Sequence, residues 1–166
     1  DEELEGIGGS VETSIGLLSG SASVNVLSEY TDLGLEVLAQ VLRYPTFDED
    51  KIELAKVGER SSISRRNDDP QQIAFREFYN VIYGKESVYA RDPEYATINA
   101  ISRDDLVNFH GEWCHPENVQ IAVWGDLDKK EIVEKIKTYF GDWPNGGTTV
   151  PEAPEVDYDW DRHVFV

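Results

Sequence analysis

The spacing of apolar and β-branched residues follows two different periods, and the change between them constrains the fold more than any other feature of the sequence. Before residue 28, strand-forming residues occupy every second position in two short runs, Val11 to Ile15 and Ala22 to Val26. From residue 31 onward apolar residues recur every three to four positions. A period of two is typical of half-buried strands and a period near 3.6 is typical of amphipathic helices. The pattern therefore predicts a β-hairpin, turning at Ser19-Gly20, followed by helices.

Prolines and capping residues mark the ends of the predicted helices. The first helix begins near Thr31 and is stopped by Pro45. Asp48 and Asp69 are placed to cap the next two helices, because an aspartate before the first turn accepts hydrogen bonds from free amide groups. Pro70 fits the first helical position, where no amide donor is needed. Two more helices are predicted to begin after Ser102 and Asp128.

A third strand is predicted between the last two helices, where Val119, Ile121 and Val123 alternate with other residues. The whole order predicts an α+β domain, with a partly antiparallel sheet and helices packed on one face. We expect the domain to occupy residues 1–143. Since the chain contains no methionine, residue 1 is not a natural start, and the chain is expected to be a processed product or a segment of a longer protein. Residues 144–158 are rich in proline and glycine and are predicted to be a linker. Residues 159–166, with His163 to Val166, are predicted to open another strand.

The charge of the chain limits its partners. The sequence has 33 acidic and 15 basic side chains, which gives a formal net charge of -18. Such a charge repels phosphate backbones and anionic lipids, so neither nucleic acid nor a membrane surface is an expected partner. No segment approaches the roughly 20 apolar residues of a membrane helix, and we expect this part of the protein to be soluble.

The residues that bind metals in other proteins form only one candidate cluster in this sequence. His110 and His115 are five positions apart, with Glu112 and Cys114 between them. Two ligands on one helix face are usually four positions apart, and Pro116 ends the helix at the second histidine. A small metal site and ordinary cap and turn roles both remain open for this cluster, and the spacing favours the second.

The sequence offers no convincing nucleophile. The serine-rich segments 19–23 and 61–64 lack the Gly-x-Ser-x-Gly elbow of serine hydrolases. Cys114 is the single cysteine and is more typical of a small buried thiol. Asp68-Asp69 precede a helix-opening proline, so capping is the favoured role for this acidic pair. We therefore name no catalytic residue.

A series of short motifs resembles the M16 metallopeptidase family, which includes pitrilysin, insulinase and mitochondrial processing peptidase. The resemblance covers residues 3–143 and depends on the order and spacing of the motifs. The motifs are, in order, Arg65-Arg66-Asn67-Asp68-Asp69-Pro70, Phe75-Arg76-Glu77-Phe78, Ile82-Tyr83-Gly84, Tyr89-Ala90-Arg91, Thr97-Ile98, Ile101-Ser102-Arg103-Asp104-Asp105-Leu106, Phe109-His110, His115-Pro116 and Val123-Trp124-Gly125-Asp126. The fold that this implies is the layered α+β domain of LuxS/M16 metallohydrolases.

The resemblance also implies where zinc ligands would lie. Catalytic M16 halves carry His-x-x-Glu-His on a helix, and a later glutamate is the third ligand. The motif is not in this chain, and the family pattern places it upstream of residue 1. At the later position, before Ile63, the sequence has Ser62, which cannot supply an anionic ligand. Glu59 lies one helical turn earlier and is the weaker alternative ligand.

By this resemblance the chain is expected to belong to a zinc metalloendopeptidase system that acts on peptides or unfolded segments. Ser62 favours the catalytically silent half, which encloses substrate together with a second M16-like half from the same chain or another subunit. Zinc is then expected in the catalytic half and not in this chain. A truncated zinc-bearing half and a structural scaffold subunit are the alternatives. The resemblance also points to a bacterial periplasm or cell envelope.

Overall fold

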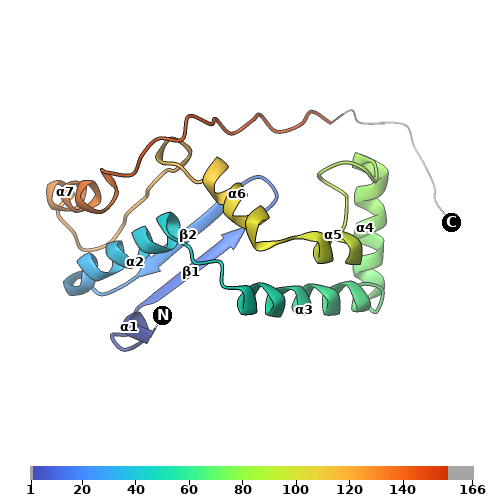
Figure 1. Cartoon of the computed structure of the whole chain (residues 1–166), viewed down its shortest axis with the longest axis horizontal. Helices are drawn as coiled ribbons and strands as arrows, with labels where there is room; N and C mark the ends of the chain where they lie inside the picture. The colour runs from blue at the N-terminus through green and yellow to red at the C-terminus, as the bar shows by residue number, and fades with distance from the viewer. Residues whose placement is uncertain (1, 157–166) are drawn as a thin grey trace. The chain divides into compact units, whose positions relative to one another are not determined.

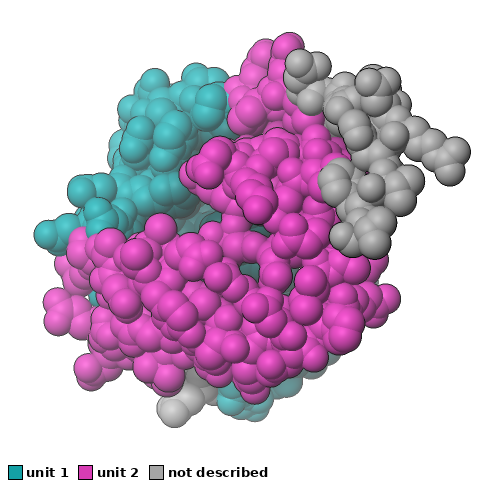
Figure 2. All heavy atoms as spheres, turned by 90° about the vertical axis from the view of Figure 1, so that its right-hand side faces the viewer, with its two compact units in different colours: residues 1–47, 104–151 teal, residues 48–103, 152–166 magenta. Residues whose placement is uncertain are grey.

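The computed structural model describes residues 2–156, and its chain divides into two compact units (Figure 2). Unit 1 contains the residues up to Phe47 together with Asp104–Pro151. Unit 2 contains Asp48–Arg103 and the residues from Glu152 onward. The strand predicted at 159–166 lies outside the described residues.

Unit 1 begins with a short helix and the predicted hairpin (Figure 1). Helix α1 (Glu2–Glu5) precedes strands β1 (Ser10–Ile15) and β2 (Gly20–Asn25). The strands are antiparallel, with Val11 opposite Val24, and the Gly16 amide donates to the Ser19 carbonyl at 2.8 Å. The hairpin is therefore confirmed, but its turn consists of residues 16–19, and Gly20 already belongs to β2, opposite Ile15.

Helix α2 (Thr31–Arg43) packs on the hairpin, and a glycine of the helix, Gly34, lies at this contact. Gly34 is buried, and a Cβ atom added to it would lie 2.9 Å from Val26 Cγ2. Only glycine lets the helix axis approach the strand this closely without displacing the valine. Ala22 and Val24 of β2 pack against the buried cluster to which Leu35 and Leu38 belong.

Helix α7 (Lys129–Phe140) covers α2 and completes the core of unit 1. Asp128 caps it as predicted, since the carboxylate accepts from the amides of Lys130 and Glu131. Lys135 Nζ lies 2.6 Å from Asp32 Oδ2 and ties α7 to the first turn of α2. The buried cluster at this contact consists of Leu35, Leu38, Ala39, Ile132 and Phe140.

The third strand predicted at Val119 to Val123 is not observed. After helix α6 (Arg103–Trp113) and a 3-10 turn, η2 (Pro116–Asn118), the chain continues through residues 119–124 without helix or strand. Strand assignment requires ladder hydrogen bonds, and within residues 2–156 the only sheet is the β1–β2 pair. Alternation predicts which residues suit a strand but does not provide the neighbouring strand.

The described part of unit 2 contains helices α3 (Glu49–Arg65), α4 (Pro70–Tyr83) and α5 (Tyr95–Ala100). Asp48 and Asp69 cap α3 and α4 through their carboxylates, which confirms both predicted starts. The short α5 was not predicted, and it packs against α3. Ile63 of α3 and Ala90 of the loop before α5 are the buried apolar residues of the described part of this unit.

The structure is a helix-rich α+β chain with a small antiparallel sheet, as the sequence predicted. Helix α2 lies on the hairpin and α7 packs on α2, so these two helices and the hairpin form the stacked core of unit 1 (Figure 1). None of the helices between residues 2 and 156 combines the length and apolar character needed to cross a bilayer.

Candidate functional site

The residue that the M16 resemblance places at the third-ligand position lies on the exposed surface of α3. Ser62 is exposed, and its Oγ donates to the Gly58 carbonyl at 3.2 Å. A serine in a helix commonly returns its hydroxyl hydrogen bond to the preceding turn in this way. The hydroxyl is therefore bound to its own helix, and Ser62 presents no anionic oxygen.

Glu59, the alternative ligand, is also exposed on α3. No described residue forms an ion pair with its carboxylate within 4.0 Å. Zinc in proteins requires three or four ligands at about 2 Å from the ion. In the described part of the chain no three His, Cys, Asp or Glu residues come close enough together to hold a metal ion. The donor set of residues 2–156 therefore does not fit a zinc centre.

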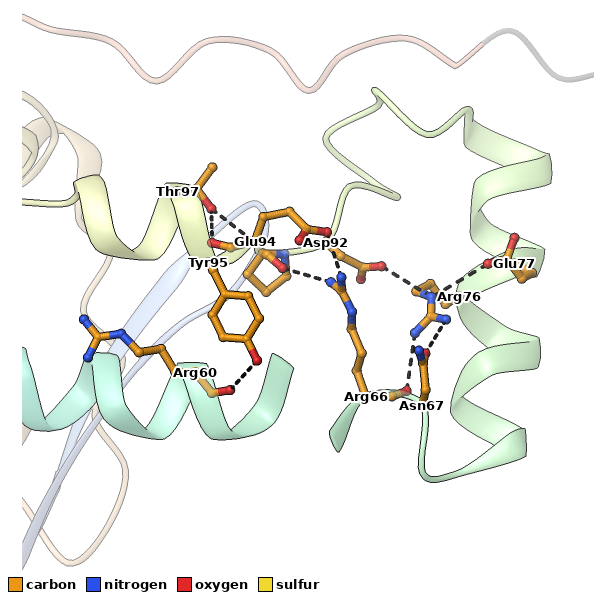
Figure 3. A network of polar contacts seen from close by, with 10 residues as sticks. Arg60, Arg66, Asn67, Arg76, Glu77, Asp92, Glu94, Tyr95 and Thr97 are labelled. Carbon is orange, nitrogen blue, oxygen red and sulfur yellow. Dashed lines mark hydrogen bonds and ion pairs between the residues drawn. The ribbon is translucent and has the colours of Figure 1, made fainter. Parts of the chain in front are cut away.

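Two arginines hold α3 to the loop that leads into α5 (Figure 3). Arg66, directly after α3, donates to the Pro93 carbonyl at 3.1 Å and pairs with Glu94 at 2.9 Å. Arg76 of α4 donates to the Arg66 carbonyl at 3.3 Å and to Asn67 Oδ1 at 2.9 Å. Since a guanidinium has five donors in a rigid fork, each arginine fixes two partners at once.

The same network extends along α3 to α5. Arg60 Nε donates to Asn99 Oδ1 at 2.8 Å, and the Tyr95 hydroxyl donates to the Arg60 carbonyl at 3.4 Å. Ile63 packs inward with 6% of its surface exposed. The network therefore fixes one side of α3 against α5, while Glu59 and Ser62 remain exposed on the helix.

A pocket of about 310 Å³ lies in unit 2, between the first turns of α3 and the segment from Asn99 to Arg103. Its wall contains Ile52 and Ile101 together with two acidic and two basic side chains. Lys56 Nζ and Glu53 Oε1 of this wall already form an ion pair at 2.8 Å. Neither Glu59 nor Ser62 lines the pocket, so it is separate from the predicted ligand position.

His110 and Cys114 contact the C-terminal end of α2 and do not face each other as metal ligands. His110 Nε2 lies 2.8 Å from the Leu42 carbonyl oxygen, and Cys114 Sγ donates to the same oxygen at 3.3 Å. Because a carbonyl can only accept, His110 carries its proton on Nε2. Leu42 is in the last turn of α2, where carbonyl groups lack helical partners. Both side chains therefore cap α2.

Burial raises the pKa of the Cys114 thiol. A raised pKa lowers the thiolate fraction at neutral pH, and the thiolate is the nucleophilic form. Glu112 is exposed on α6, and the His115 ring lies against Gly146. The structure does not bring the four residues of this cluster together as a metal site.

Nothing in the sequence pattern indicates that Arg66, Arg76 and Glu94 form a network. Arg66 appeared only inside a motif, and the carbonyls that the arginines bind carry no signal in the sequence. The Asp69-Pro70 helix start could have indicated a tight α3–α4 connection, which needs nearby donors for its exposed carbonyls.

Comparisons with known proteins find an M16 family profile and several zinc proteases. The profile of the family described as "Peptidase M16 inactive domain" matches residues 100–165. An uncharacterized zinc protease of Rickettsia bellii is 25% identical over 150 residues, which covers 87% of this chain and 35% of that protein. An uncharacterized zinc protease of Bacillus subtilis is 26% identical over 156 residues, covering 93% of this chain and 38% of that protein.

Solved structures match the fold over almost the whole chain. The M16 inactive domain from Pseudomonas fluorescens superposes with a TM-score of 0.84 at 22% identity, covering 94% of this chain and 38% of that one. A protease from Helicobacter pylori gives a TM-score of 0.76 at 19% identity, covering 95% and 39%. The fold is that of the layered α+β domains found in these peptidases.

The chain is therefore similar in sequence and in fold to proteins of the M16 peptidase family. It spans 35% and 38% of the lengths of the two zinc proteases above, so it corresponds to one part of such a protein.

Proposed function

We propose that this chain is part of the catalytically silent half of an M16 zinc endopeptidase, where it helps to enclose a peptide or an unfolded segment. In this role it holds no zinc. The zinc-bearing half is a second M16-like domain in the same protein or in another subunit.

The proposal rests on one observation, which is that Ser62 occupies the position where the family resemblance places the third zinc ligand. The position lies on an exposed helix face, where a ligand would be accessible, but its hydroxyl donates to the Gly58 carbonyl. The match of residues 100–165 to an inactive-domain profile supports the same assignment. A serine at this position leaves the site without the negative charge that a third zinc ligand supplies.

The hairpin gives this half a surface suited to extended peptides. Strands β1 and β2 pair only with each other in the described residues, so the outer edge of each strand has unpaired backbone groups. An extended peptide can add to such an edge as a further strand. The formal net charge of -18 would favour peptides with basic side chains.

The first test is zinc content in the full-length protein that contains this chain, measured per molecule after dialysis against trace zinc. The informative comparison is Glu59→Gln, with Glu86→Gln as the control at another exposed glutamate of unit 2. The silent half predicts the same zinc content in both variants and in the wild type. Loss of zinc only in Glu59→Gln would overturn the proposal and establish Glu59 as a ligand.

Peptide cleavage separates the silent half from a structural scaffold. The full assembly, with its zinc-bearing half present, is expected to cleave an unstructured peptide that contains basic residues. An assembly that binds zinc but cleaves no peptide of this kind would favour the scaffold alternative.

A further inference from the structure

Residues 144–154, which the sequence assigns to a linker, make specific contacts near both ends. The segment has no helix or strand and contains Pro144, Pro151 and Pro154 as well as a glycine pair. A free linker of this composition would be a solvated coil. In this chain its backbone is instead bound by side chains from elsewhere in the sequence.

The first anchor lies in unit 1, on the turn η2. Glu117 Oε1 accepts from the Gly147 amide at 2.7 Å. Asn118 Nδ2 donates both to the Thr148 carbonyl and to the Trp113 carbonyl, each at 3.0 Å. Glu117 therefore binds the amide of Gly147, and Asn118 binds the carbonyl of Thr148, the next residue of the segment. We call Glu117, Asn118 and His115 the cradle.

The glycine pair fits the cradle by shape. A Cβ atom on Gly146 would overlap the imidazole of His115, so the backbone of residue 146 lies directly against that ring. Gly147 has a φ of +75°, a conformation that side chains other than glycine rarely adopt. Gly146 is thus needed for the close contact with His115, and Gly147 is needed for its positive φ. The glycine pair therefore does not indicate a flexible segment.

The negative charge of Glu117 strengthens the first anchor. The pKa of Glu117 is lowered, first by its own backbone amide and then by the amide of Gly147. The carboxylate form is therefore favoured in the folded protein, and a charge-assisted hydrogen bond to Gly147 follows.

The second anchor lies in unit 2. The Tyr89 hydroxyl donates to the Pro154 carbonyl at 2.9 Å. The Tyr89 ring is held by Tyr83 of α4, with ring centroids 5.4 Å apart, and its amide donates to Ser87 Oγ at 3.2 Å. Proline has no amide donor, so its carbonyl is the backbone group through which position 154 can be held. We call this contact the tyrosine clasp.

We propose that residues 144–154 form a docked strap, held by the cradle at one end and by the tyrosine clasp at the other. The cradle fixes the backbone of the strap within unit 1, and the tyrosine clasp fixes it within unit 2. The strap's importance for enclosing a peptide rests on the proposed function.

The cradle is tested by hydrogen exchange followed by mass spectrometry on the full-length protein. Glu117→Ala should accelerate exchange of the Gly147 amide by about tenfold, which is the effect of losing one charge-assisted hydrogen bond. Glu112→Ala, at an exposed glutamate just before the turn, should change nothing. Unchanged exchange in α2 shows that the variant is folded. A Gly147 amide that exchanges at the unprotected rate in the wild type overturns the cradle.

The tyrosine clasp is tested with a glutamate-specific protease, because Glu152 and Glu155 flank Pro154. Tyr89→Phe removes only the hydroxyl and should increase cleavage after Glu152 several-fold. Tyr95→Phe is the matched control, since its hydroxyl also donates to a carbonyl, that of Arg60. Equal cleavage in Tyr89→Phe and the wild type overturns the clasp. Neither readout depends on zinc or peptidase activity, so the strap and the proposed function can fail separately.

Discussion

Arg43 and Asp142 join the ends of two helices, with 2.8 Å between Nη1 of the arginine and Oδ1 of the aspartate. The same Nη1 donates to the Tyr139 carbonyl at 2.7 Å, in the last turn of α7. The Arg43 side chain is 9% exposed, whereas that of Asp142 is 77% exposed. A buried cation at the negative end of a helix is thus held by one exposed carboxylate and one backbone carbonyl.

Replacing Arg43 by methionine should destabilise unit 1 by about 1–3 kcal/mol. The variant keeps most of the apolar stem but leaves the Tyr139 carbonyl without its donor. The guanidinium also lies over the Tyr44 ring, 5.1 Å from its centroid, and that contact is lost too. Urea unfolding monitored by tryptophan fluorescence measures the change, and a midpoint equal to that of the wild type would contradict it.

Stability should decrease at acidic pH partly through Asp142. The hydrogen bond from Arg43, followed by its positive charge, lowers the pKa of this carboxyl below its ordinary value of about 4. A lowered folded-state pKa contributes stability above the unfolded-state pKa, and this contribution is lost as the pH falls through the folded-state pKa. Asp142→Asn should therefore flatten the decrease in thermal midpoint below about pH 4. An unchanged profile would mean that Arg43 does not favour the Asp142 carboxylate.

Two glycine-to-alanine substitutions should change stability in opposite directions. Gly34→Ala forces a Cβ atom to within 2.9 Å of Val26 and should cost about 1–2 kcal/mol. Gly58→Ala, inside α3 with no atom within 4 Å of the new Cβ, should stabilise the helix by about 0.5–1 kcal/mol. Thermal unfolding of both variants compares them directly. A gain in both would show that α2 can move away from the hairpin at little cost.

Arg76→Lys should loosen the connection between α3 and α4 although the charge is kept. Lysine cannot reproduce the forked contacts to the Arg66 carbonyl and Asn67 Oδ1, so a loss of about 1–2 kcal/mol is expected. Arg65→Lys, at an exposed arginine of α3, is the control and should have little effect. Hydrogen exchange of residues 66–69 should increase only in Arg76→Lys. Equal exchange in both variants would show that the fork is not needed.

Cys114 should be alkylated slowly in the folded protein. Burial raises the pKa of its thiol, and Sγ donates to the Leu42 carbonyl, so little thiolate is present at neutral pH. Because it is the single cysteine of the chain, iodoacetamide labelling followed by peptide mass spectrometry reports on this thiol alone. We expect much faster labelling in urea. Equal rates with and without urea would contradict the protection of this half-buried thiol.

Sequence reasoning found the helix starts because their causes are local. The carboxylates of Asp48, Asp69 and Asp128 each accept hydrogen bonds from amides two or three positions later, and one part of the sequence contains both partners. The hairpin was found for a similar reason, since both strands and their turn lie within residues 10–25. The missing strand at 119–124 had the right alternation but no partner strand in the described residues.

The candidate site was predicted only in part. The sequence identified Ser62 as a residue that cannot be an anionic ligand, and the structure adds that its hydroxyl is bound to Gly58. The arginine network and the contacts of residues 144–154 were not predicted. Both include a side chain that binds a backbone carbonyl far along the chain, 27 positions away for Arg66 with Pro93 and 65 positions away for Tyr89 with Pro154.

The sequence by itself determined the hairpin, most helix boundaries, the acidic charge and the absence of His-x-x-Glu-His. The tertiary structure alone decided which carbonyl His110 and Cys114 bind, which face of α3 is exposed, and how the glycine pair at 146–147 is held. The reason is physical. Capping and periodicity act within a few residues, whereas a backbone carbonyl is the same group at every position, so only folding determines which donor reaches it.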